Sequence, residues 1–222
     1  MKFRLSWLLL VVLTSACAPA GGYGEILERP SGHPAATVPL TTPPRPAPRD
    51  LPAETHTGKG SGEFTTSWPA DQLGFFTFDC PKCSGNVLID TDGGEDGLVN
   101  AIGAYKGTTW LNTYPDRPTR TVTIRATAAW TATIADHRSL TTAESGKPAK
   151  GTGDAVLKLP AGVTRVQFAA KTPNNVALWV ISPEKRDLLV NEIGDTQVEC
   201  DVRGPALLRV DGYEASWTLT PS

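Results

Sequence analysis

Histidine is scarce in this sequence. There are three among 222 residues: His33 and His56 lie in a proline-rich N-terminal segment, and His137 is the only histidine of the remaining chain. A catalytic base must be held in fixed geometry against its nucleophile, and no spacing among the 23 carboxylates singles out an acid–base pair. We therefore expect a protein that is not an enzyme, with no catalytic residue, no cofactor and no metal.

Basic clusters and helical periodicity are also missing. The formal net charge is −2, and Lys and Arg are not concentrated anywhere. This disfavours nucleic-acid binding, which needs a concentrated basic surface to displace counterions. From about residue 60 onward, Val, Ile, Thr and Trp alternate with Gly, Asp and Pro turns. That pattern predicts an all-β fold.

The N-terminal apolar stretch is too short to cross a bilayer. Residues 5–13 follow Lys2 and Arg4 and precede small residues, the layout of a secretory signal peptide. The stretch LTSAC resembles the lipobox of bacterial lipoproteins, although Thr14 stands where Leu is usual. We expect a signal peptide over 1–16 and a lipid anchor on Cys17, which would hold the protein at the outer face of the cell membrane. The alternative is an ordinary signal peptide cleaved nearby.

The next segment, residues 17–58, has the composition of a tether. Nine of the nineteen prolines fall between residues 18 and 58, and TTPPRPAPRD at 41–50 is the densest run. Too few apolar residues are present to offset the entropy of ordering. The globular part then divides into a first unit at 59–136, a linker at 137–150 and a second unit at 151–222.

This division depends on an internal repeat. LVNAIG at 98–103 returns as LVNEIG at 189–194, and AAWTATI at 128–134 returns as ASWTLT at 215–220. GSGE at 60–63 matches GTGD at 151–154, at the same offset of 91 as the hexapeptide. Tandem duplication explains matches that keep their order and near-constant spacing. We expect two small antiparallel β-sandwiches of jelly-roll type.

The expected strands follow the alternating pattern. In the first unit they lie near 63–68, 75–80, 86–91, 98–104, 108–112, 120–127 and 129–135. In the second they lie near 154–159, 165–170, 176–182, 188–193, 197–202, 206–211 and 215–220.

Residues that recur in both units are interpreted as architecture. Asn100 and Asn191 are expected to point inward and to satisfy a neighbouring loop. Trp130 and Trp217 are expected in the two cores, and Gly103 and Gly194 at bends after their strands.

The motif DCPKCSGN at 79–86 offers three alternatives. A disulfide suits an oxidising compartment; a zinc site lacks further ligands, and a thioredoxin-type pair lacks a helix. We favour a Cys80–Cys83 bridge with Cys200 as a buried thiol, and a bridge to Cys200 remains the alternative. The acidic run at 90–96 is interpreted as a solvated hairpin turn, because a calcium loop would need an oxygen ligand at Gly94.

Trp110 is the favoured binding residue. Its counterpart in the second unit is Asp201, and its phase opposes that of Thr109 and Leu111, which predicts that it faces solvent. An exposed Trp can stack on a sugar or anchor a protein. With Asn112 and Tyr114 nearby, we expect a weak ligand site for a cell-wall glycan or an envelope protein.

The motifs DCPKCSGN, LVNAIGAYKG and DLLVNEIG together resemble those of uncharacterised predicted lipoproteins of high-GC Gram-positive bacteria, over roughly residues 60–222. The strand pattern is also similar to the jelly-roll modules of secreted peptidases. Neither resemblance supplies a catalytic residue. The sequence thus predicts a membrane-anchored envelope protein that binds a ligand or partner; a thiol-redox or zinc protein using Cys80 and Cys83, or a structural spacer, are the alternatives.

Overall fold

Nearly all regular structure among the residues that the structure describes is β-strand. The computed structural model describes residues 46–95, 97–182 and 186–222. The predicted signal peptide, the predicted lipidation site Cys17 and most of the predicted tether lie outside the described residues. The part that the model does describe falls within one compact unit, so contacts between its two sandwiches are part of the fold.

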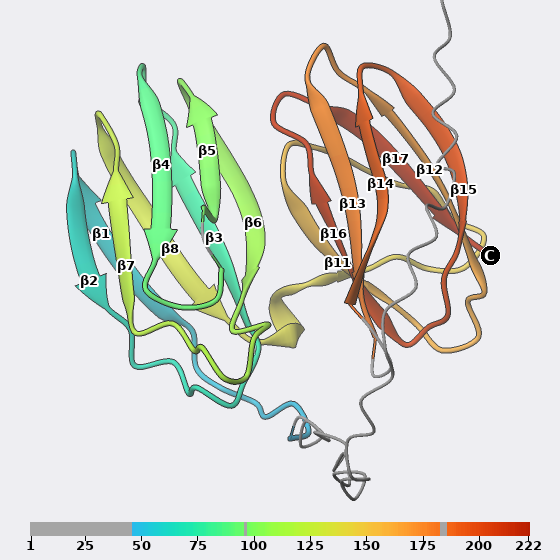
Figure 1. Cartoon of the computed structure of the whole chain (residues 1–222), viewed down its shortest axis with the longest axis horizontal. Helices are drawn as coiled ribbons and strands as arrows, with labels where there is room; N and C mark the ends of the chain where they lie inside the picture. The colour runs from blue at the N-terminus through green and yellow to red at the C-terminus, as the bar shows by residue number, and fades with distance from the viewer. Residues whose placement is uncertain (1–45, 96, 183–185) are drawn as a thin grey trace, which may run out of the picture. The chain divides into compact units, whose positions relative to one another are not determined.

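The first sandwich contains eight strands in two four-stranded sheets (Figure 1). One sheet has the order β1-β8-β3-β6 and the other β2-β7-β4-β5, and all pairs are antiparallel. This winding of eight strands is that of a jelly roll. The strands are β1 (Glu54–Lys59), β2 (Gly62–Thr65), β3 (Gly74–Cys80), β4 (Asn86–Thr91), β5 (Val99–Ile102), β6 (Tyr105–Leu111), β7 (Thr121–Arg125) and β8 (Ala129–Ala135).

The second sandwich has the same strand order. Its sheets are β10-β17-β12-β15 and β14-β13-β16-β11, the latter extended by the short parallel strand β9. A 3-10 turn, η1 (His137–Ser139), precedes it. The strands are β9 (Thr141–Thr142), β10 (Ala149–Thr152), β11 (Ala155–Leu159), β12 (Arg165–Lys171), β13 (Asn175–Ile181), β14 (Arg186–Ile193), β15 (Thr196–Asp201), β16 (Ala206–Asp211) and β17 (Ser216–Pro221). The prediction of two all-β jelly-roll-like sandwiches is confirmed; common descent by duplication stays an inference from the matching order.

Each sandwich encloses its own apolar core. In β3, Phe76 and Phe78 are fully buried and alternate with Thr77, because successive side chains point to opposite faces of a sheet. They pack with Ile89 of β4 and Ile124 of β7 from the opposite sheet. In the second sandwich, Phe168, Leu178, Leu208 and Leu219 fill the corresponding core.

The two repeated tryptophans have equivalent environments, as predicted. Trp130 donates from Nε1 to the Gly60 carbonyl at 2.9 Å, and Trp217 donates to the Gly153 carbonyl at 2.9 Å. Each indole also lies against a strand glycine, Gly58 or Gly151, where a Cβ would come within 2.3 or 2.2 Å of the ring. Gly58 therefore corresponds to Gly151 and Gly60 to Gly153. The predicted match of Gly60 to Gly151 was displaced by two residues.

The prediction that Asn100 and Asn191 point inward is wrong, since both side chains are exposed. The inward residues of β5 are Val99 and Ala101. Leu98 is buried but precedes the strand, so its burial does not set the phase of the strand. The expected bends are present: Gly103 and Gly194, just after β5 and β14, have φ of +91° and +89°.

The first sandwich begins earlier than residue 59, its predicted start. Residues 54–58 belong to β1, an edge strand that pairs only with β8. Its sequence ETHTGK lacks large apolar residues, which is why it was assigned to the tether. An edge strand needs little burial, and here the Glu54 carboxylate accepts hydrogen bonds from Thr66 and Ser67 beside β2.

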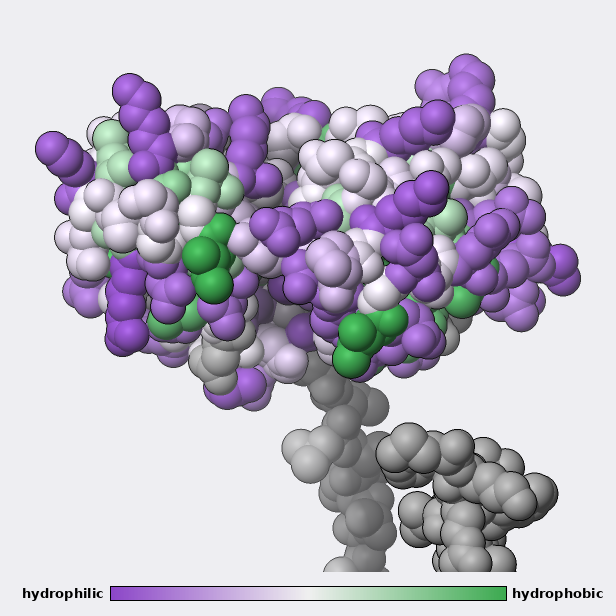
Figure 2. Space-filling view, turned by 90° about the horizontal axis from the view of Figure 1, so that it is seen from above, coloured by the Kyte–Doolittle hydropathy of each residue, from purple (hydrophilic) through white to green (hydrophobic). Residues whose placement is uncertain are grey.

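The surface has few large apolar side chains. Among the described residues these are Ile102, Leu188 and Ile193, and the face in Figure 2 is mainly hydrophilic, with apolar residues in small separate groups. Scattered single apolar residues are ordinary on protein surfaces. No helix within the described ranges has the length and apolar character needed to cross a membrane.

Candidate functional site

Trp110 is fully buried, so the prediction that it faces solvent is wrong. It does point away from the core of its own sandwich, as its phase predicted, and pairs across the β3–β6 ladder with Phe75. Both residues belong to a separate apolar cluster with Leu140 of the connection and Val156 of β11. Trp179, Ile181 and Leu207 of the second sandwich pack against it. The second sandwich therefore covers the face on which Trp110 lies.

Polar contacts flank this junction. The Tyr105 hydroxyl donates to Asp154 Oδ2 at 2.6 Å, and the Thr108 backbone N–H donates to the Asp154 carbonyl at 3.0 Å. Burial and the neighbouring Asp154 carboxylate raise the pKa of Tyr105 above its ordinary value. Tyr213 also donates from its hydroxyl to the Ile102 carbonyl. Apolar and hydrogen-bonded contacts together fix the junction.

Two guanidinium groups of the second sandwich lie over Trp110. Arg186 Cζ is 5.8 Å from the ring centroid, and Arg209 Cζ is 5.5 Å from it. Arg186, at the start of β14, also lies over Trp179 at 5.7 Å and Tyr114 at 4.5 Å, and it donates to Thr113 Oγ1 at 2.9 Å. Cation–π contacts at these distances hold the planar Arg186 side chain among three rings.

Tyr114 connects Arg186 to a third arginine. It lies in the loop between β6 and β7, and Arg117 of the same loop stacks over its ring with Cζ 5.2 Å from the centroid. The Arg117 backbone N–H donates to the Tyr114 carbonyl at 3.2 Å. Gly94 provides the room for this ring, since a Cβ there would come within 2.4 Å of Tyr114. The loop therefore presents Tyr114 and Arg117 as one unit.

These residues line a partly open cavity of about 290 Å³, which we call the arginine cavity. Its size is near the lower end of the range for small-molecule sites, about 300–1,000 Å³. Its lining consists of Gly94, Glu95, Gly97, Leu98, Tyr114, Arg117, Arg186 and Arg209. The first sandwich and the second both contribute, so the cavity exists only because they pack together.

The acidic run beside the cavity is not the solvated turn that was expected. Glu95 is buried, and its carboxylate accepts hydrogen bonds from the backbone N–H groups of Asn112 and Thr113 and from Thr113 Oγ1. Asp92 accepts from the N–H groups of Arg120 and Thr121, both at 2.8 Å. These bonds hold both ends of the β6–β7 loop. The hydrogen bonds to backbone N–H groups also lower the pKa of Asp92, against the opposing effect of its burial.

Asn112 is part of that support and is not among the residues that line the cavity. It is buried, with φ of +61°. Its Nδ2 donates to the carbonyls of Pro69 and Gln72, and its Oδ1 accepts from the Thr119 N–H at 2.8 Å. Of the three predicted ligand-binding residues, Trp110 and Asn112 are therefore buried supports and Tyr114 lines the cavity.

Arg209 differs from the other two arginines because its charge is already paired. Its Nε donates to Asp211 Oδ1. Burial raises the pKa of Asp211, although the adjacent guanidinium opposes this shift. Within the described part of the chain, no carboxylate forms an ion pair with Arg117 or Arg186, and both residues are exposed.

The predicted Cys80–Cys83 disulfide is confirmed. It closes the turn after β3, and both cysteines are buried, which disfavours exchange with an external thiol. Cys200 is free and half-buried beside the second core. Burial, with a smaller contribution from the Asp201 charge, raises the pKa of its thiol, and this makes it a poor nucleophile.

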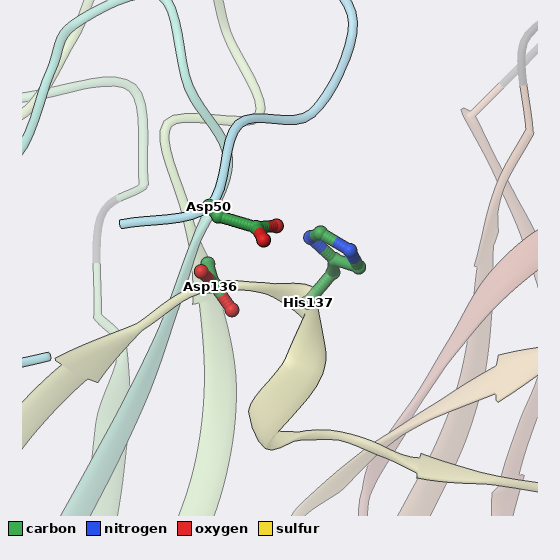
Figure 3. Close-up of side chains that lie close together, drawn as sticks. All are labelled: Asp50, Asp136 and His137. Carbon is green, nitrogen blue, oxygen red and sulfur yellow. The ribbon is translucent and has the colours of Figure 1, made fainter. Parts of the chain in front are cut away.

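A cluster of Asp50, Asp136 and His137 has metal-ligating atoms within 4.8 Å of one another (Figure 3). Arg138 already engages both carboxylates, with Nη2 2.7 Å from Asp136 Oδ2 and Nη1 3.3 Å from Asp50 Oδ2. Asp136 also accepts from the Leu51 N–H at 2.7 Å. A guanidinium in this position disfavours a divalent cation. We interpret the cluster as an anchor of residues 50–51 to the connection between the sandwiches.

None of the three arginines of the cavity was predicted from the sequence. Arg117, Arg186 and Arg209 are spread over two units and belong to no cluster along the chain. The uniqueness of the loop around Tyr114 was the one available signal. The arginines become a group only through packing of the two sandwiches.

No family model and no curated protein matches this chain. Among solved structures, it is similar to a conserved protein of unknown function from Pseudomonas aeruginosa PAO1, with 12% sequence identity and a TM-score of 0.25. The similarity covers 75% of this chain and 76% of that one. At that TM-score it supports no argument about fold or function.

Proposed function

We propose that this chain is a non-enzymatic binding protein of the cell envelope that holds its ligand in the arginine cavity. The observation that carries the proposal is the set of exposed side chains from both sandwiches that face one partly open cavity, with Arg117 and Arg186 stacked over Tyr114. Polar groups in fixed positions around a concavity are typical of ligand sites.

The lining favours binding over catalysis. The described lining residues include no Ser, Cys, His or Lys, the side chains that most often act as a nucleophile or as its base. The single carboxylate among them, Glu95, has both oxygens engaged by the β6–β7 loop. The cavity therefore offers donors and charge for recognition.

The cellular setting of the proposal comes from the N-terminal sequence. A signal peptide over 1–16, a lipid anchor on Cys17 and a proline-rich tether would display the cavity outside the cytoplasmic membrane. The ligand would then be a cell-wall glycan or an envelope protein, and we favour the glycan because the cavity is small.

Sedimentation of the full-length protein with purified insoluble cell wall tests the proposal. Wild-type protein is expected in the pellet, and Tyr114→Ala is expected to reduce the sedimented fraction at least several-fold, because Tyr114 is a wall of the cavity. Ile193→Ala, which truncates a side chain that is 83% exposed and lies outside the cavity lining, is the control and is expected to sediment like wild type. Equal sedimentation of wild type and Tyr114→Ala contradicts the proposal.

A second measurement tests the anchor. Cys17→Ala is expected to move the protein from the membrane fraction to the soluble fraction. A membrane fraction unchanged by this substitution would contradict the lipid anchor and leave the cavity proposal intact.

A further inference from the structure

We propose that the arginine cavity recognises an anionic group on its ligand, a carboxylate or a phosphate, and that Arg117 and Arg186 hold it. This inference rests on the proposed function, because it names the chemistry of the ligand at the same site. The group would belong to an acidic sugar or a sugar phosphate of the envelope.

The stacking of Arg186 leaves its hydrogen-bond donors available. A guanidinium carries five N–H donors, all in its plane. The rings of Tyr114, Trp179 and Trp110 have their centroids 4.5, 5.7 and 5.8 Å from Arg186 Cζ. A cation–π contact attracts the charge of the guanidinium and supplies no oxygen acceptor for its N–H groups. One hydrogen bond to Thr113 Oγ1 uses the edge. The remaining in-plane donors match the paired oxygens of a carboxylate or phosphate.

Arg117 contributes a second charge that no described carboxylate pairs. Its side chain lies over Tyr114, and no described carboxylate forms an ion pair with it. Arg209, by contrast, is engaged by Asp211. Two of the three arginines of the lining therefore carry charges that no described carboxylate neutralises by an ion pair. Unpaired positive charge with free donors favours an anion over a neutral ligand.

The same geometry disfavours recognition of a neutral sugar by ring stacking. Stacking needs an open aromatic face. Two guanidinium groups already lie over the Tyr114 ring, 4.5 and 5.2 Å from its centroid, and Trp110 is fully buried. The rings of this site hold arginines in position, and the arginines would contact the ligand.

Three probes of matched size test the inference: glucuronate, glucose 6-phosphate and glucose. Each is titrated into the full-length protein labelled with ¹⁵N, at low salt, and amide shifts of residues 94–98 and 112–117 are followed. We expect saturable shifts with the two anions and none with glucose. The tighter of the two anionic probes identifies the group as a carboxylate or a phosphate.

Arg117→Gln and Arg186→Gln are each expected to weaken binding of the anionic probe by roughly tenfold or more, as for other hydrogen bonds to charged groups. Arg165→Gln removes the same charge from an exposed strand position outside the cavity and is expected to change binding less than twofold. An unchanged amide spectrum of each free variant shows that it is folded. Added salt is expected to weaken binding of the anions.

The inference is overturned if glucose binds as tightly as the anions, if no probe shifts these amides, or if Arg165→Gln weakens binding as much as Arg117→Gln. These failures differ from failure of the proposed function. If cell-wall sedimentation still depends on Tyr114 while the arginine substitutions have no effect, the protein binds its ligand through the cavity, but the arginines do not recognise an anionic group on it.

Discussion

The two sandwiches share a strand order but differ at one equivalent pair of positions. Counted from the matched tryptophans Trp130 and Trp217, the cross-strand pair Phe75–Trp110 of the first corresponds to Arg165–Asp201 of the second. Phe75 and Trp110 are buried at 2% and 0% exposure. The Asp201 side chain is 91% exposed and lies 3.4 Å from Arg165.

The equivalent sheet faces thus have different roles in the two sandwiches. In the second sandwich this face is a solvated surface with an ion pair, whose contribution to stability is small. In the first it is an apolar contact covered by Val156 and Trp179. Two sandwiches with the same strand order can therefore use the equivalent face differently, as a buried junction in one and as a solvated surface in the other. Residues that differ at equivalent positions are first candidates for such a junction, and a ligand site can form beside it.

The largest expected effect comes from disrupting the junction between the sandwiches, the apolar cluster that contains Trp110. Trp110→Ala deletes a fully buried aromatic side chain and is expected to lower the free energy of unfolding by about 3–5 kcal/mol. Urea unfolding followed by far-UV circular dichroism measures it. Asp201→Ala, at the equivalent position, is expected to change the free energy by less than about 0.5 kcal/mol. If the two substitutions lower the free energy of unfolding by similar amounts, the face that carries Trp110 does not form a stabilising junction between the sandwiches.

The connection between the sandwiches should be sensitive to acid. Arg138, together with the N–H groups of Leu51 and Arg138, lowers the pKa of Asp136 well below its usual range. A lowered pKa contributes stability that is present above the unfolded-state pKa, about 3.9, and is lost as the pH falls below it. At pH 7, Asp136→Asn is expected to lower the free energy of unfolding by about 1.5–3 kcal/mol, because it removes charged hydrogen bonds.

Urea unfolding at pH 7 and pH 3 separates this effect from a packing change. The difference between wild type and Asp136→Asn should shrink at pH 3, where wild-type Asp136 takes up a proton as the chain unfolds. Asp50→Asn is the matched control, since Asp50 touches the same Arg138 but is 69% exposed. A difference that stays constant with pH would assign the effect of Asp136→Asn to shape and not to charge.

The disulfide is a second asymmetry between the copies. Cys80 and Cys83 are bridged in the first sandwich, whereas the second has Ala170-Lys171-Thr172-Pro173 at the equivalent place, with the Thr172 N–H bonded to Asp195. For so short a loop the chain-entropy estimate is about 2 kcal/mol. Reduction is expected to lower the unfolding free energy by about this amount, and a Cys80→Ser, Cys83→Ser double variant should not respond to reductant. No response of the wild type would show that the bridge contributes nothing to stability.

Local pattern was sufficient to predict the strands of both sandwiches. Each predicted strand is present within a few residues, because alternation such as that of Phe76, Thr77 and Phe78 reports burial directly. The strands that were missed, β1, β9 and β10, are edge strands, and an edge strand such as β1 lacks the alternation of large apolar residues that burial requires. The prediction that Asn100 points inward was wrong because the buried residue Leu98 precedes β5 and does not belong to it. Including Leu98 in the strand exchanges the expected inward and outward positions.

The candidate site could be predicted only in part. The phase of Trp110 correctly turned it away from its own core, but no local pattern records that another sandwich covers that face. Tyr114 was predicted only because it is close to Trp110 in the sequence. Arg186 and Arg209 reach the cavity from strands of the other copy, and that approach depends on the tertiary packing that the sequence does not display.

The smallest expected effect tests whether the copies are alike where they are said to be alike. Trp130→Phe and Trp217→Phe each leave one carbonyl, Gly60 or Gly153, without its indole donor. Each is expected to lower the free energy of unfolding by roughly 1 kcal/mol, and the two values should agree within about 0.5 kcal/mol, because both rings lie against a strand glycine at the same depth. Chemical denaturation of the two variants under identical conditions measures the difference. A much larger difference between the two free-energy changes would mean that the two sandwiches have different cores despite their shared strand order. The comparison of Trp110 with Asp201 would then no longer report on the junction alone.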